Sequence, residues 1–415
     1  MVKEMKLLFV HQKFGEFGGA ESNIRLTANE LRSRGYTLGL LHAESSARNE
    51  LEWQEIFSER FCLPAADSSK FARSVLQQFQ PQLIYMHNLP DLAVLETLLD
   101  SGVPVVRMVH DHALYCMRGY KYNYFTRRAC SRAFSPFCVF PCLASVARNP
   151  GKGFPLKWVS YTEKKKEIAL NQRCDHLIVY SDYLKKELIH NGFAADRIEV
   201  CVPLRMWNDE TLISSFSPRN LILFAGQLIR GKGGDVLLQA LAKVRTHFEC
   251  AILGDGSHRP HCERLAARLG LSDRVTFHGY VLPGELGQFY RDASIFVMGS
   301  LWPEPFGMAG PEAMRYGLPV VAFDAGGIRE WLTDGENGYL IAWKNVDLFA
   351  ARLDQLLGDK QLARRLGRCA FEGVQSYDSC RQIDRLESIF KKLLRPTKDR
   401  SFKSQHSQNH LPAYE

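Results

Sequence analysis

Two successive runs of short apolar segments alternating with helical patterns constrain the fold of this chain more than any other feature. The first run begins at residue 6, and the same alternation starts again near residue 220. Strands separated by helices predict repeated βαβ units, which build a parallel sheet covered on both faces. The predicted strands are 6–10, 37–42, 83–87, 103–109, 178–181 and 198–203 in the first run, and 220–225, 250–253, 275–277, 294–298 and 319–323 in the second.

The length of 415 residues is too great for a single core, and usual domain sizes predict two to three domains. We expect two facing Rossmann-like α/β halves, joined by a linker at 204–218, with the cleft between them as the active site. The expected divisions are a domain 1–205 with a Cys-rich insert 113–150, a domain 206–380, a helix 381–395 that returns to the first domain, and a disordered polar tail 396–415.

The composition is that of an ordinary globular protein, with 46% hydrophobic and 24% charged residues and a formal charge of +8. Such a mild, diffuse excess fits anionic small molecules or a membrane surface and does not argue for nucleic acid. The first residues have too short an apolar core for a signal peptide, and no apolar run approaches 18 residues. We therefore expect a cytoplasmic protein whose eleven cysteines are thiols or metal ligands.

A segment beginning at Trp302, WPEPFGMAGPEAMRYG, holds two glutamates, Glu304 and Glu312, with seven residues between them. Pro311 suits a helix start, and free amide groups at such a start can bind phosphate. If the span were helical throughout, the two acids would lie roughly 12 Å apart. Spacing alone leaves two interpretations open, a capped surface helix with solvated acids or a ligand site.

Two motifs of the first half have similar alternatives. Gly18 and Gly19 lie between a strand and a helix, where they could let the backbone approach a phosphate or could simply form a tight turn. His110 and Asp111 end a predicted strand, where a histidine can act as acid, base or charge stabiliser, or can be a hydrogen-bonded loop residue.

The predicted insert contains four cysteines separated by thirteen, seven and three residues. Soft thiolates favour Zn²⁺, so one hypothesis is a structural zinc site, and the other is a set of buried thiols within an apolar cluster. The four residues are Cys116, Cys130, Cys138 and Cys142. Trp158, Tyr161 and the lysines of 164–166 follow, and could contact anionic lipid or form a solvated helix face.

Taken together, the motifs resemble those of the family 4 glycosyltransferases over nearly the whole chain except about the last twenty residues. They are GGAE at 18–21, HD at 110–111, GQLIRGKGG at 226–234, GDG at 254–256, HGY at 278–280, and PEPFGMAGPEAMRYGLPVVAFDAGGIRE from Pro303. The resemblance implies the GT-B fold and transfer of a sugar, with retention, from a UDP- or GDP-sugar to a hydroxyl of a glycan or lipid-linked acceptor. It also implies a role in cell-surface polysaccharide or glycolipid synthesis.

The resemblance further implies a role for each matching residue. Glu304 would hold donor-sugar hydroxyls and Glu312 the ribose, while Lys232 would bind the diphosphate and His110 would lie at the reacting carbon. The remaining implied donor-binding residues are Gly18, Gly19, Gln227, Gly254, His278, Gly279, Phe306, Gly307, Met308 and Ala309.

One departure from the family pattern concerns the phosphate clamp. Similar enzymes commonly carry Arg where this chain has Gln227, and we expect Arg230 to take its place. No Asp-x-Asp pair occurs in the sequence, so no cofactor is expected for catalysis, and Lys232 with Arg230 would stabilise the leaving phosphate. The alternatives are a sugar-nucleotide epimerase or hydrolase on the same fold, and a non-catalytic homologue acting as a scaffold.

Overall fold

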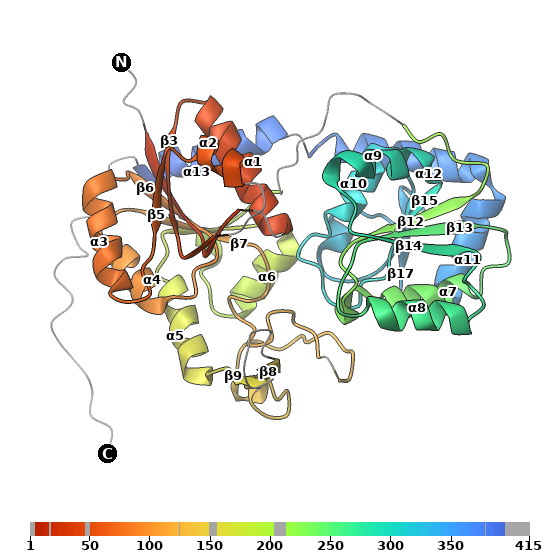
Figure 1. The fold of residues 1–415 in the computed structure, drawn as a ribbon, viewed down its shortest axis with the longest axis horizontal. Helices are drawn as coiled ribbons and strands as arrows, with labels where there is room; N and C mark the ends of the chain where they lie inside the picture. Colours follow the sequence, from red (N-terminus) through yellow and green to blue (C-terminus); the bar gives the residue numbers. More distant parts are fainter. Residues whose placement is uncertain are drawn as a thin grey trace.

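The computed structural model of the protein describes residues 5–15, 18–45, 50–123, 125–148, 156–202, 213–377 and 379–394. They form two α/β domains, each built on one parallel sheet with helices on both of its faces (Figure 1). The predicted fold class is therefore correct. The expected domain boundary at 205/206 and the expected tail both lie outside the described residues.

The N-terminal domain contains a seven-stranded parallel sheet with the order β11-β10-β7-β6-β1-β3-β5. Its central strands are almost completely buried, since helices cover both faces, and this burial explains their near-continuous apolar sequences. The strands are β1 (Lys6–Val10), β3 (Thr37–His42), β5 (Glu59–Cys62), β6 (Leu83–Met86), β7 (Val105–Val109), β10 (His176–Val179) and β11 (Ile198–Val200). The helices are α1 (Gly19–Ser33), α2 (Glu50–Ile56), α3 (Ser68–Phe79), α4 (Leu92–Leu99), α5 (Tyr161–Asn171) and α6 (Asp182–His190).

The C-terminal domain repeats this plan with six parallel strands in the order β14-β13-β12-β15-β16-β17. The strands are β12 (Leu221–Ala225), β13 (Glu249–Leu253), β14 (Val275–Gly279), β15 (Ile295–Met298), β16 (Val320–Phe323) and β17 (Gly338–Ile341). The helices are α7 (Gly234–Leu241), α8 (Arg259–Arg268), α9 (Pro283–Asp292), α10 (Ala309–Arg315), α11 (Val346–Gly358) and α12 (Lys360–Val374). In both sheets the chain reverses its direction of strand addition beside the first strand, so each sheet has a switch point, between β1 and β6 and between β12 and β15.

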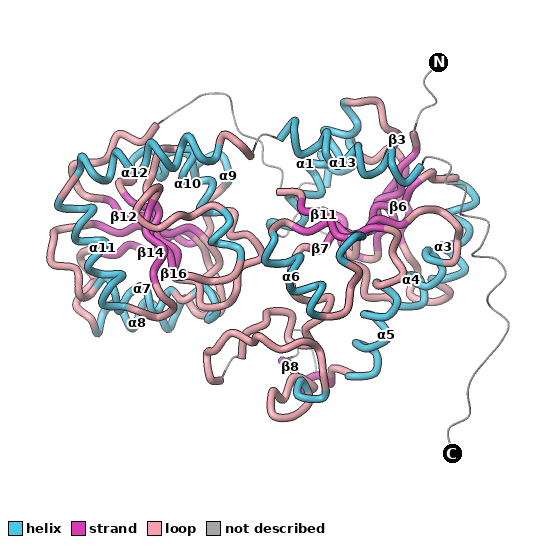
Figure 2. Tube along the Cα trace, turned by 180° about the vertical axis from the view of Figure 1, so that it is seen from behind, coloured by secondary structure: helices cyan, strands magenta, loops and turns pink. Residues whose placement is uncertain are grey.

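The last helix, α13 (Ser379–Leu394), lies against the N-terminal domain (Figure 2). Its Asp384 accepts a hydrogen bond from Arg34 at 2.5 Å, and its Phe390 ring packs against Tyr85 with ring centroids 5.3 Å apart. The helix thus clasps the N-terminal domain after the chain has completed the C-terminal one. Among the helices of the described ranges, none combines the length and the apolar composition that crossing a bilayer requires.

The segment between β7 and α5 forms a lobe of mostly irregular structure that projects from the N-terminal domain (Figures 1 and 2). Its regular parts are a short 3₁₀ turn, η1 (Pro136–Cys138), and an antiparallel ribbon of β8 (Val146–Arg148) and β9 (Leu156–Trp158). The other short elements are β2 (Lys13–Phe14), which pairs with β4 (Glu44–Ser45), and the 3₁₀ turns η2 (Ala195–Arg197), η3 (Arg230–Lys232) and η4 (Gly327–Glu330).

Candidate functional site

Lys232 and Glu304 approach each other across the switch point of the C-terminal sheet. Lys232 ends the η3 turn after β12, and Glu304 lies in the loop after β15, the neighbouring strand. The Lys232 ammonium lies 2.8 Å from one Glu304 carboxylate oxygen and 3.0 Å from the other. Ligands of open parallel sheets bind in this position, outside the carboxyl ends of the strands at the switch point. The structure therefore unites two of the residues predicted for the donor site.

The carboxylate of Glu304 is ionised although it is almost fully buried, with 2% of the residue exposed. Burial alone would raise its pKa, but the charge and hydrogen bonds of Lys232, with a hydrogen bond from Ser300, hold the pKa below its usual value. The Lys232 ammonium also lies 4.9 Å from the centroid of the Trp302 ring, a cation–π distance. The site thus contains a fixed negative and a fixed positive group side by side.

Glycines after β16 hold the backbone of Glu304 in place. The Glu304 amide donates to Ala325 O at 3.2 Å, and its carbonyl accepts from the Gly327 amide at 2.7 Å. Gly326 between them has φ 66°, and a Cβ there would lie 2.5 Å from the Glu304 carbonyl oxygen. Only glycine fits such a close backbone approach, so the GG of the predicted GGIRE segment positions Glu304.

The turn after Pro305 presents backbone amides. Within the part of the chain that the structure describes, the amide groups of Phe306, Gly307 and Met308 donate to no protein acceptor. Gly307 has φ 85°, and the carbonyl of Phe306 is held by the Trp331 indole N–H at 2.7 Å. Consecutive free amides in a turn of this kind form an anion-binding concavity. This agrees with the amide role that the family resemblance implied for this turn and for Ala309, the first residue of α10.

Glu312 lies one turn into α10 and is also buried, and its carboxylate accepts a hydrogen bond from Tyr290 at 3.1 Å. The span from Glu304 to Glu312 is not helical throughout, because the helix begins only at Ala309. Two prolines and Gly307 precede it, so the spacing of 1.5 Å per residue does not apply to the first half of the span. The alternative of two solvated surface acids is wrong for both glutamates.

The ends of β12, β13 and β14 meet through glycines. The Gly254 amide donates to Gly279 O at 2.6 Å, and a Cβ on Gly254 would lie 2.0 Å from the carbonyl oxygen of Gly226. Gln227 and His278 are exposed beside this contact. Gly254 and Gly279 therefore serve the packing of the backbone here. The side chains exposed beside them are those of Gln227 and His278.

Arg230 lies in the η3 turn, two residues before Lys232, and is partly exposed. The charge of Arg230 acts on His258. Burial is the main cause that lowers the pKa of His258, and the charges of Arg127 and Arg230 lower it further. The Arg127 guanidinium bonds both oxygens of Asp235 on α7, at 2.5 and 2.8 Å. Asp235, His258 and His261 offer ligand atoms within 4.8 Å of one another, but Arg127 already binds both oxygens of this carboxylate.

In the N-terminal domain, a row of polar side chains follows four adjacent strands. His11, His87, His110 and Tyr180 are each the first residue after β1, β6, β7 and β10. One ring nitrogen of His110 lies 2.8 Å from His87 Nδ1 and the other 2.5 Å from the Tyr180 hydroxyl. Both ring nitrogens are thus engaged. Burial lowers the pKa of His110 to about 3, so the ring is neutral at physiological pH.

Gly18 caps helix α1 and Gly19 is its first residue, after the loop that follows β1 and contains β2. Gly19 is exposed, and a Cβ built there would meet no atom within 4 Å, so space beside this helix start is open. Glu21 in the same turn lies 3.3 Å from His11. The predicted helix start at Ser22 is three residues too late, because glycines carry no propensity signal for a helix.

Two hydrogen bonds bring the carboxyl ends of the two sheets together. His112, which follows β7, donates from Nε2 to the Pro303 carbonyl at 2.8 Å, and its Nδ1 accepts from the Tyr115 hydroxyl at 2.7 Å. Ser181, which follows β10, donates to the Pro305 carbonyl at 2.5 Å. Both acceptors flank Glu304 in the sequence. Sequence reasoning missed His112 and Ser181, although His112 lies three residues after the predicted strand 103–109 and Ser181 is the last residue of the predicted strand 178–181.

The four cysteines of the insert gather loosely. The thiol of Cys138 has its pKa raised by burial and, to a smaller degree, by the other three sulfurs. No three of the four sulfurs lie within 4.8 Å of one another, as three ligands of one zinc ion would. The Cys142 sulfur accepts a hydrogen bond from Arg118 Nε at 3.3 Å. As placed, the four thiols do not form a tetrahedral set.

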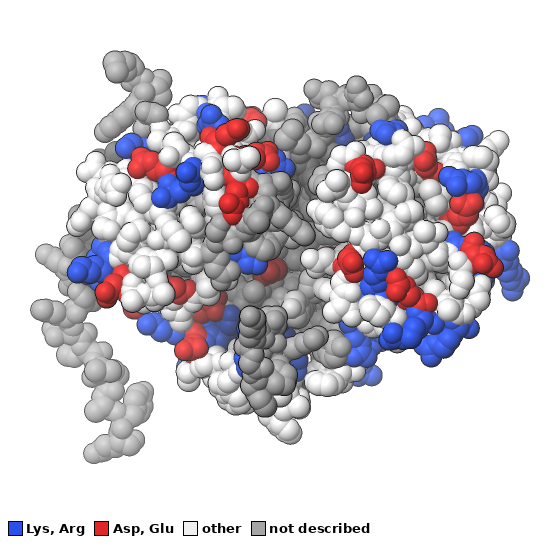
Figure 3. Space-filling view, viewed as in Figure 1, with Lys and Arg blue, Asp and Glu red and all other residues white. Residues whose placement is uncertain are grey.

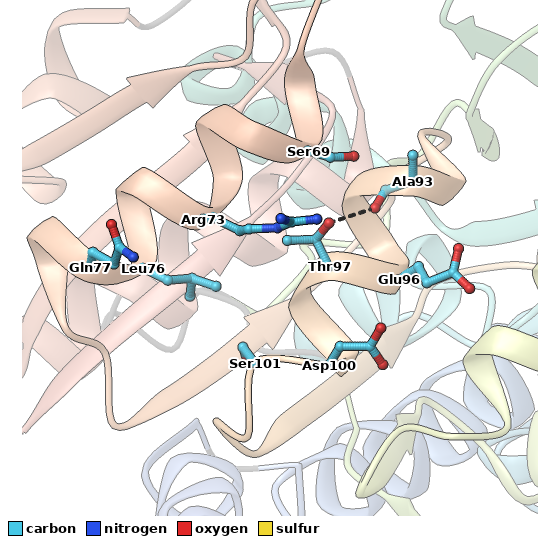
Figure 4. A pocket seen from close by; sticks show the side chains of 9 residues that line it. All are labelled: Ser69, Arg73, Leu76, Gln77, Ala93, Glu96, Thr97, Asp100 and Ser101. Atoms are coloured by element: carbon cyan, nitrogen blue, oxygen red, sulfur yellow. Dashed lines mark hydrogen bonds between the residues drawn. The ribbon is translucent and has the colours of Figure 1, made fainter. Parts of the chain in front are cut away.

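A hollow of about 560 Å³ lies away from all of these residues, between α3 and α4 (Figure 4). It is open and has a mixed polar and apolar lining, with Arg73 on α3, Glu96 on α4 and Asp100 directly after α4, and Thr97 donates to Ala93 O at 2.9 Å within α4. It contains none of the predicted site residues, and its charged groups do not converge on one point (Figure 4).

Family models match nearly the whole described chain. Residues 17–202 match the model described as Glycosyltransferase Family 4, and residues 210–372 match Glycosyl transferases group 1. An uncharacterized glycosyltransferase of Methanocaldococcus jannaschii is 36% identical over 141 residues, which is 34% of this chain and 36% of that protein. A D-inositol 3-phosphate glycosyltransferase of Streptomyces griseus is 34% identical over 167 residues, 37% of this chain and 35% of that protein. The chain thus spans about a third of the length of these curated relatives.

Among solved structures, HepE of Anabaena in complex with UDP and glucose resembles this chain with a TM-score of 0.72. The two are 22% identical, and the match covers 94% of this chain and 100% of that one. At this identity the likeness shows the fold alone. The expected GT-B fold is confirmed.

Proposed function

Because this chain belongs to the glycosyltransferases of group 1 and family 4, we propose that it transfers a sugar from a nucleotide-diphosphate sugar, UDP- or GDP-linked, to an acceptor hydroxyl. The proposed transfer retains the anomeric configuration and needs no metal. The proposed acceptor is a glycan or a lipid-linked glycan in cell-surface polysaccharide or glycolipid synthesis. We place this activity on the cytoplasmic side of the membrane. HepE, with the same fold, binds UDP and glucose in its crystal structure, which supports the donor class.

The Lys232–Glu304 pair at the switch point is the observation that carries this proposal. A nucleotide-sugar brings two kinds of group to one place, anionic phosphates and neutral sugar hydroxyls. A lysine ammonium suits the phosphates, and an ionised carboxylate suits hydroxyl donors. The free amides of Phe306, Gly307 and Met308 lie next to this pair in the chain and offer further donors to the phosphates.

The proposed step breaks the bond between the anomeric carbon and the β-phosphate oxygen and forms a bond from the acceptor oxygen to the same face of that carbon. The acceptor proton passes to the leaving phosphate. Negative charge grows on the phosphate, where Lys232 and the turn amides stabilise it. Arg230 is the proposed further cation in place of the arginine missing at Gln227.

His110 is proposed to face the sugar at the reacting carbon. Since both of its ring nitrogens are hydrogen-bonded to His87 and Tyr180, its backbone is the group it can offer without breaking a contact. Gly19 is proposed to approach the phosphate from the N-terminal domain, His278 and Gly279 to frame the base, and Glu312 to hold the ribose.

Hydrolysis of a panel of nucleotide-sugars without acceptor, followed by product analysis with acceptor, tests the proposal. Replacing Lys232, Glu304 or His110 by Ala should abolish transfer, while Lys243→Ala, which removes an exposed ion pair with Asp347, should keep it. Thermal unfolding with and without UDP or GDP reports whether the donor site is intact in each variant. Full activity in all three site variants would refute the assignment. Absence of both hydrolysis and nucleotide-induced stabilisation would favour the scaffold alternative, and a strict need for a divalent ion would refute metal independence.

A structural zinc ion at the four cysteines stays a separate proposal. The sulfurs would have to move toward one another around Cys138. The other three thiols already contribute to the raised pKa of this residue. Elemental analysis of protein purified without added metal tests it, and less than about a tenth of an equivalent of zinc or iron would refute it.

A further inference from the structure

The lobe between β7 and α5 carries a charge that the rest of the chain lacks. Residues 113–160, called the lobe segment below, contain eight Lys or Arg and no Asp or Glu. Taking these eight from the 53 basic residues of the chain leaves 45, against 45 acidic residues. The net charge of +8 therefore resides entirely in 48 residues. The sequence total alone had suggested a diffuse excess.

The same lobe exposes large apolar side chains, of a kind that folded proteins usually bury in their core. Phe140 is 75% exposed, Trp158 73% and Phe137 55%, and Leu143, Val146 and Leu156 are also exposed. These six residues are called the apolar rim below. Exposed apolar groups gathered on one element mark an interaction site, whereas scattered ones do not.

The apolar rim is one continuous structure. Val146 pairs with Trp158 in the β8–β9 ribbon, and the Val146 amide donates to the carbonyl of Leu143 at 3.4 Å. Phe137 is the middle residue of η1, and backbone hydrogen bonds from Phe140 to Pro136 and from Leu143 to Val139 continue the turns after it. Figure 1 places β8 and β9 at the far end of the lobe, and the lower edge of the molecule there is mostly uncharged in Figure 3.

Cationic side chains flank the rim. Lys157 lies between Leu156 and Trp158 and is exposed. The Arg132 guanidinium lies 4.5 Å from the centroid of the Phe137 ring. Aromatic and aliphatic side chains next to Lys and Arg are the combination that enters the boundary of an anionic bilayer, with apolar groups among the acyl chains and cations at the phosphates.

We infer that the lobe segment docks this protein on an anionic lipid bilayer through the apolar rim and its flanking cations. A second copy of the chain fits this surface poorly. Lys121 and Arg127 are already paired with Glu187 and Asp235, but the other six cations of each lobe segment would face those of its copy with no acid in either segment. The earlier expectation had placed lipid contact on Trp158, Tyr161 and the lysines of 164–166, and of these Trp158 belongs to the apolar rim. The structure instead pairs Lys164 with Glu167 and Lys166 with Glu96, and stacks Tyr161 on Phe134 with ring centroids 4.6 Å apart.

Docking in this way would also orient the proposed site. The lobe segment starts one residue after His112, whose ring bonds the Pro303 carbonyl beside Glu304. Because the lobe joins the N-terminal domain at this edge, a lobe held at the bilayer would fix how the meeting edge of the two sheets is oriented toward the lipid surface. The inference does not depend on the proposed function, since vesicle binding is measured without donor, acceptor or turnover.

Co-sedimentation of the full chain with vesicles tests the inference. Vesicles containing phosphatidylglycerol should bind the protein about tenfold or more better than pure phosphatidylcholine vesicles at about 0.05 M NaCl, and about 0.5 M NaCl should remove most of this difference. The variant Phe140→Ser/Trp158→Ser should lose about tenfold in binding. The control Leu51→Ser/Leu282→Ser removes two exposed apolar residues outside the lobe and should bind like the parent chain.

Because Phe140 and Trp158 are exposed, their replacement should leave thermal unfolding unchanged, and that measurement accompanies each binding curve. Three results would overturn the inference: no binding of the parent chain to phosphatidylglycerol vesicles at low salt, equal loss in the control variant, or unchanged binding in Phe140→Ser/Trp158→Ser. Retention on heparin without vesicle binding would assign the charge to a soluble polyanion and overturn it as well. Loss of a dimer in the rim variant, without vesicle binding, would assign the rim to a self-interface.

Discussion

Replacing Lys232 by Met should destabilise the C-terminal domain, because it leaves the buried carboxylate of Glu304 without its cation. Glu304 is 2% exposed, and Lys232 lies 2.8 and 3.0 Å from its two oxygens. Removing one partner of a buried pair costs about 3–5 kcal/mol. The lower end applies here, since the Lys232 side chain is 22% exposed and water can partly replace it. For a domain of this size, about 3 kcal/mol lowers the Tm by roughly 6–12 °C.

The pH dependence of this loss follows from the pKa of Glu304. In the parent chain Lys232 outweighs burial and lowers the pKa, so the pair stabilises the fold above the unfolded-state value and loses this contribution as pH falls through the lowered pKa. In Lys232→Met burial is opposed only by the hydrogen bonds from Ser300 and Trp302, and we expect the pKa of Glu304 to rise above the unfolded-state value. Folding of the variant then takes up a proton at low pH, so its deficit should shrink as the pH falls from about 8 towards 4.

Calorimetry over this pH range, with Lys243→Met as control, is the assay. Lys243 makes an exposed ion pair with Asp347 at 2.5 Å, and its loss should cost less than about 1 kcal/mol. Adding Glu304→Gln to Lys232→Met removes the buried charge and should restore at least half of the lost Tm. A deficit no larger than that of the control, or one that does not change with pH and is not rescued, would refute the reasoning.

Three further predictions concern other parts of the site. Gly254→Ala should cost about 3 kcal/mol or more and should show as a lower Tm, since its Cβ would lie 2.0 Å from the Gly226 carbonyl oxygen at φ 125°. Arg127→Ala should leave the buried Asp235 carboxylate unpaired, cost about 2 kcal/mol or more, and speed proteolysis of the lobe. Since burial lowers the pKa of His110 to about 3, kcat/KM should show no limb from this histidine between about pH 5 and 8.

Matched controls exist for these variants. Gly358 ends α11 with nothing within 4 Å of an added Cβ, so Gly358→Ala should be neutral or slightly stabilising. Arg128 is the exposed neighbour of Arg127, and Arg128→Ala should not loosen the lobe. A limb near pH 6.5 that disappears in a folded His110 variant would contradict the neutral histidine.

The parallel sheets could be predicted because their strands are buried on both faces. Such strands need apolar residues at successive positions, and these runs can be recognised in the sequence. β5, β17 and helices α2 to α4 received no such prediction. β5 is mostly exposed, which weakens its pattern, whereas β17 is buried and as long as β15 and β16, and its short apolar run was not recognised. The pairing of Lys232 with Glu304 is invisible in the sequence, where 72 positions separate them; only the order of β12 and β15 in the sheet makes them neighbours. The contact from His112 to Pro303 spans 191 positions and two domains, and no local pattern encodes it.

The facing edges of the two sheets differ in the charge of their buried side chains, and this difference bears on the proposed chemistry. At the edge of the N-terminal sheet, burial and neighbouring cationic groups lower the pKa values of His87 and His110, so these two histidines are neutral. At the facing edge, Lys232 and Glu304 are both charged. A sugar that loses its phosphate gains positive charge while the phosphate gains negative charge. A cationic histidine beside the sugar would oppose that change, whereas a neutral one does not, and the lysine belongs with the phosphate. Tyr180→Phe tests this division, because removing one hydrogen bond of the His110 ring should lower kcat with little change in KM for the donor. An equal effect on nucleotide binding would place His110 with the phosphates and contradict the division.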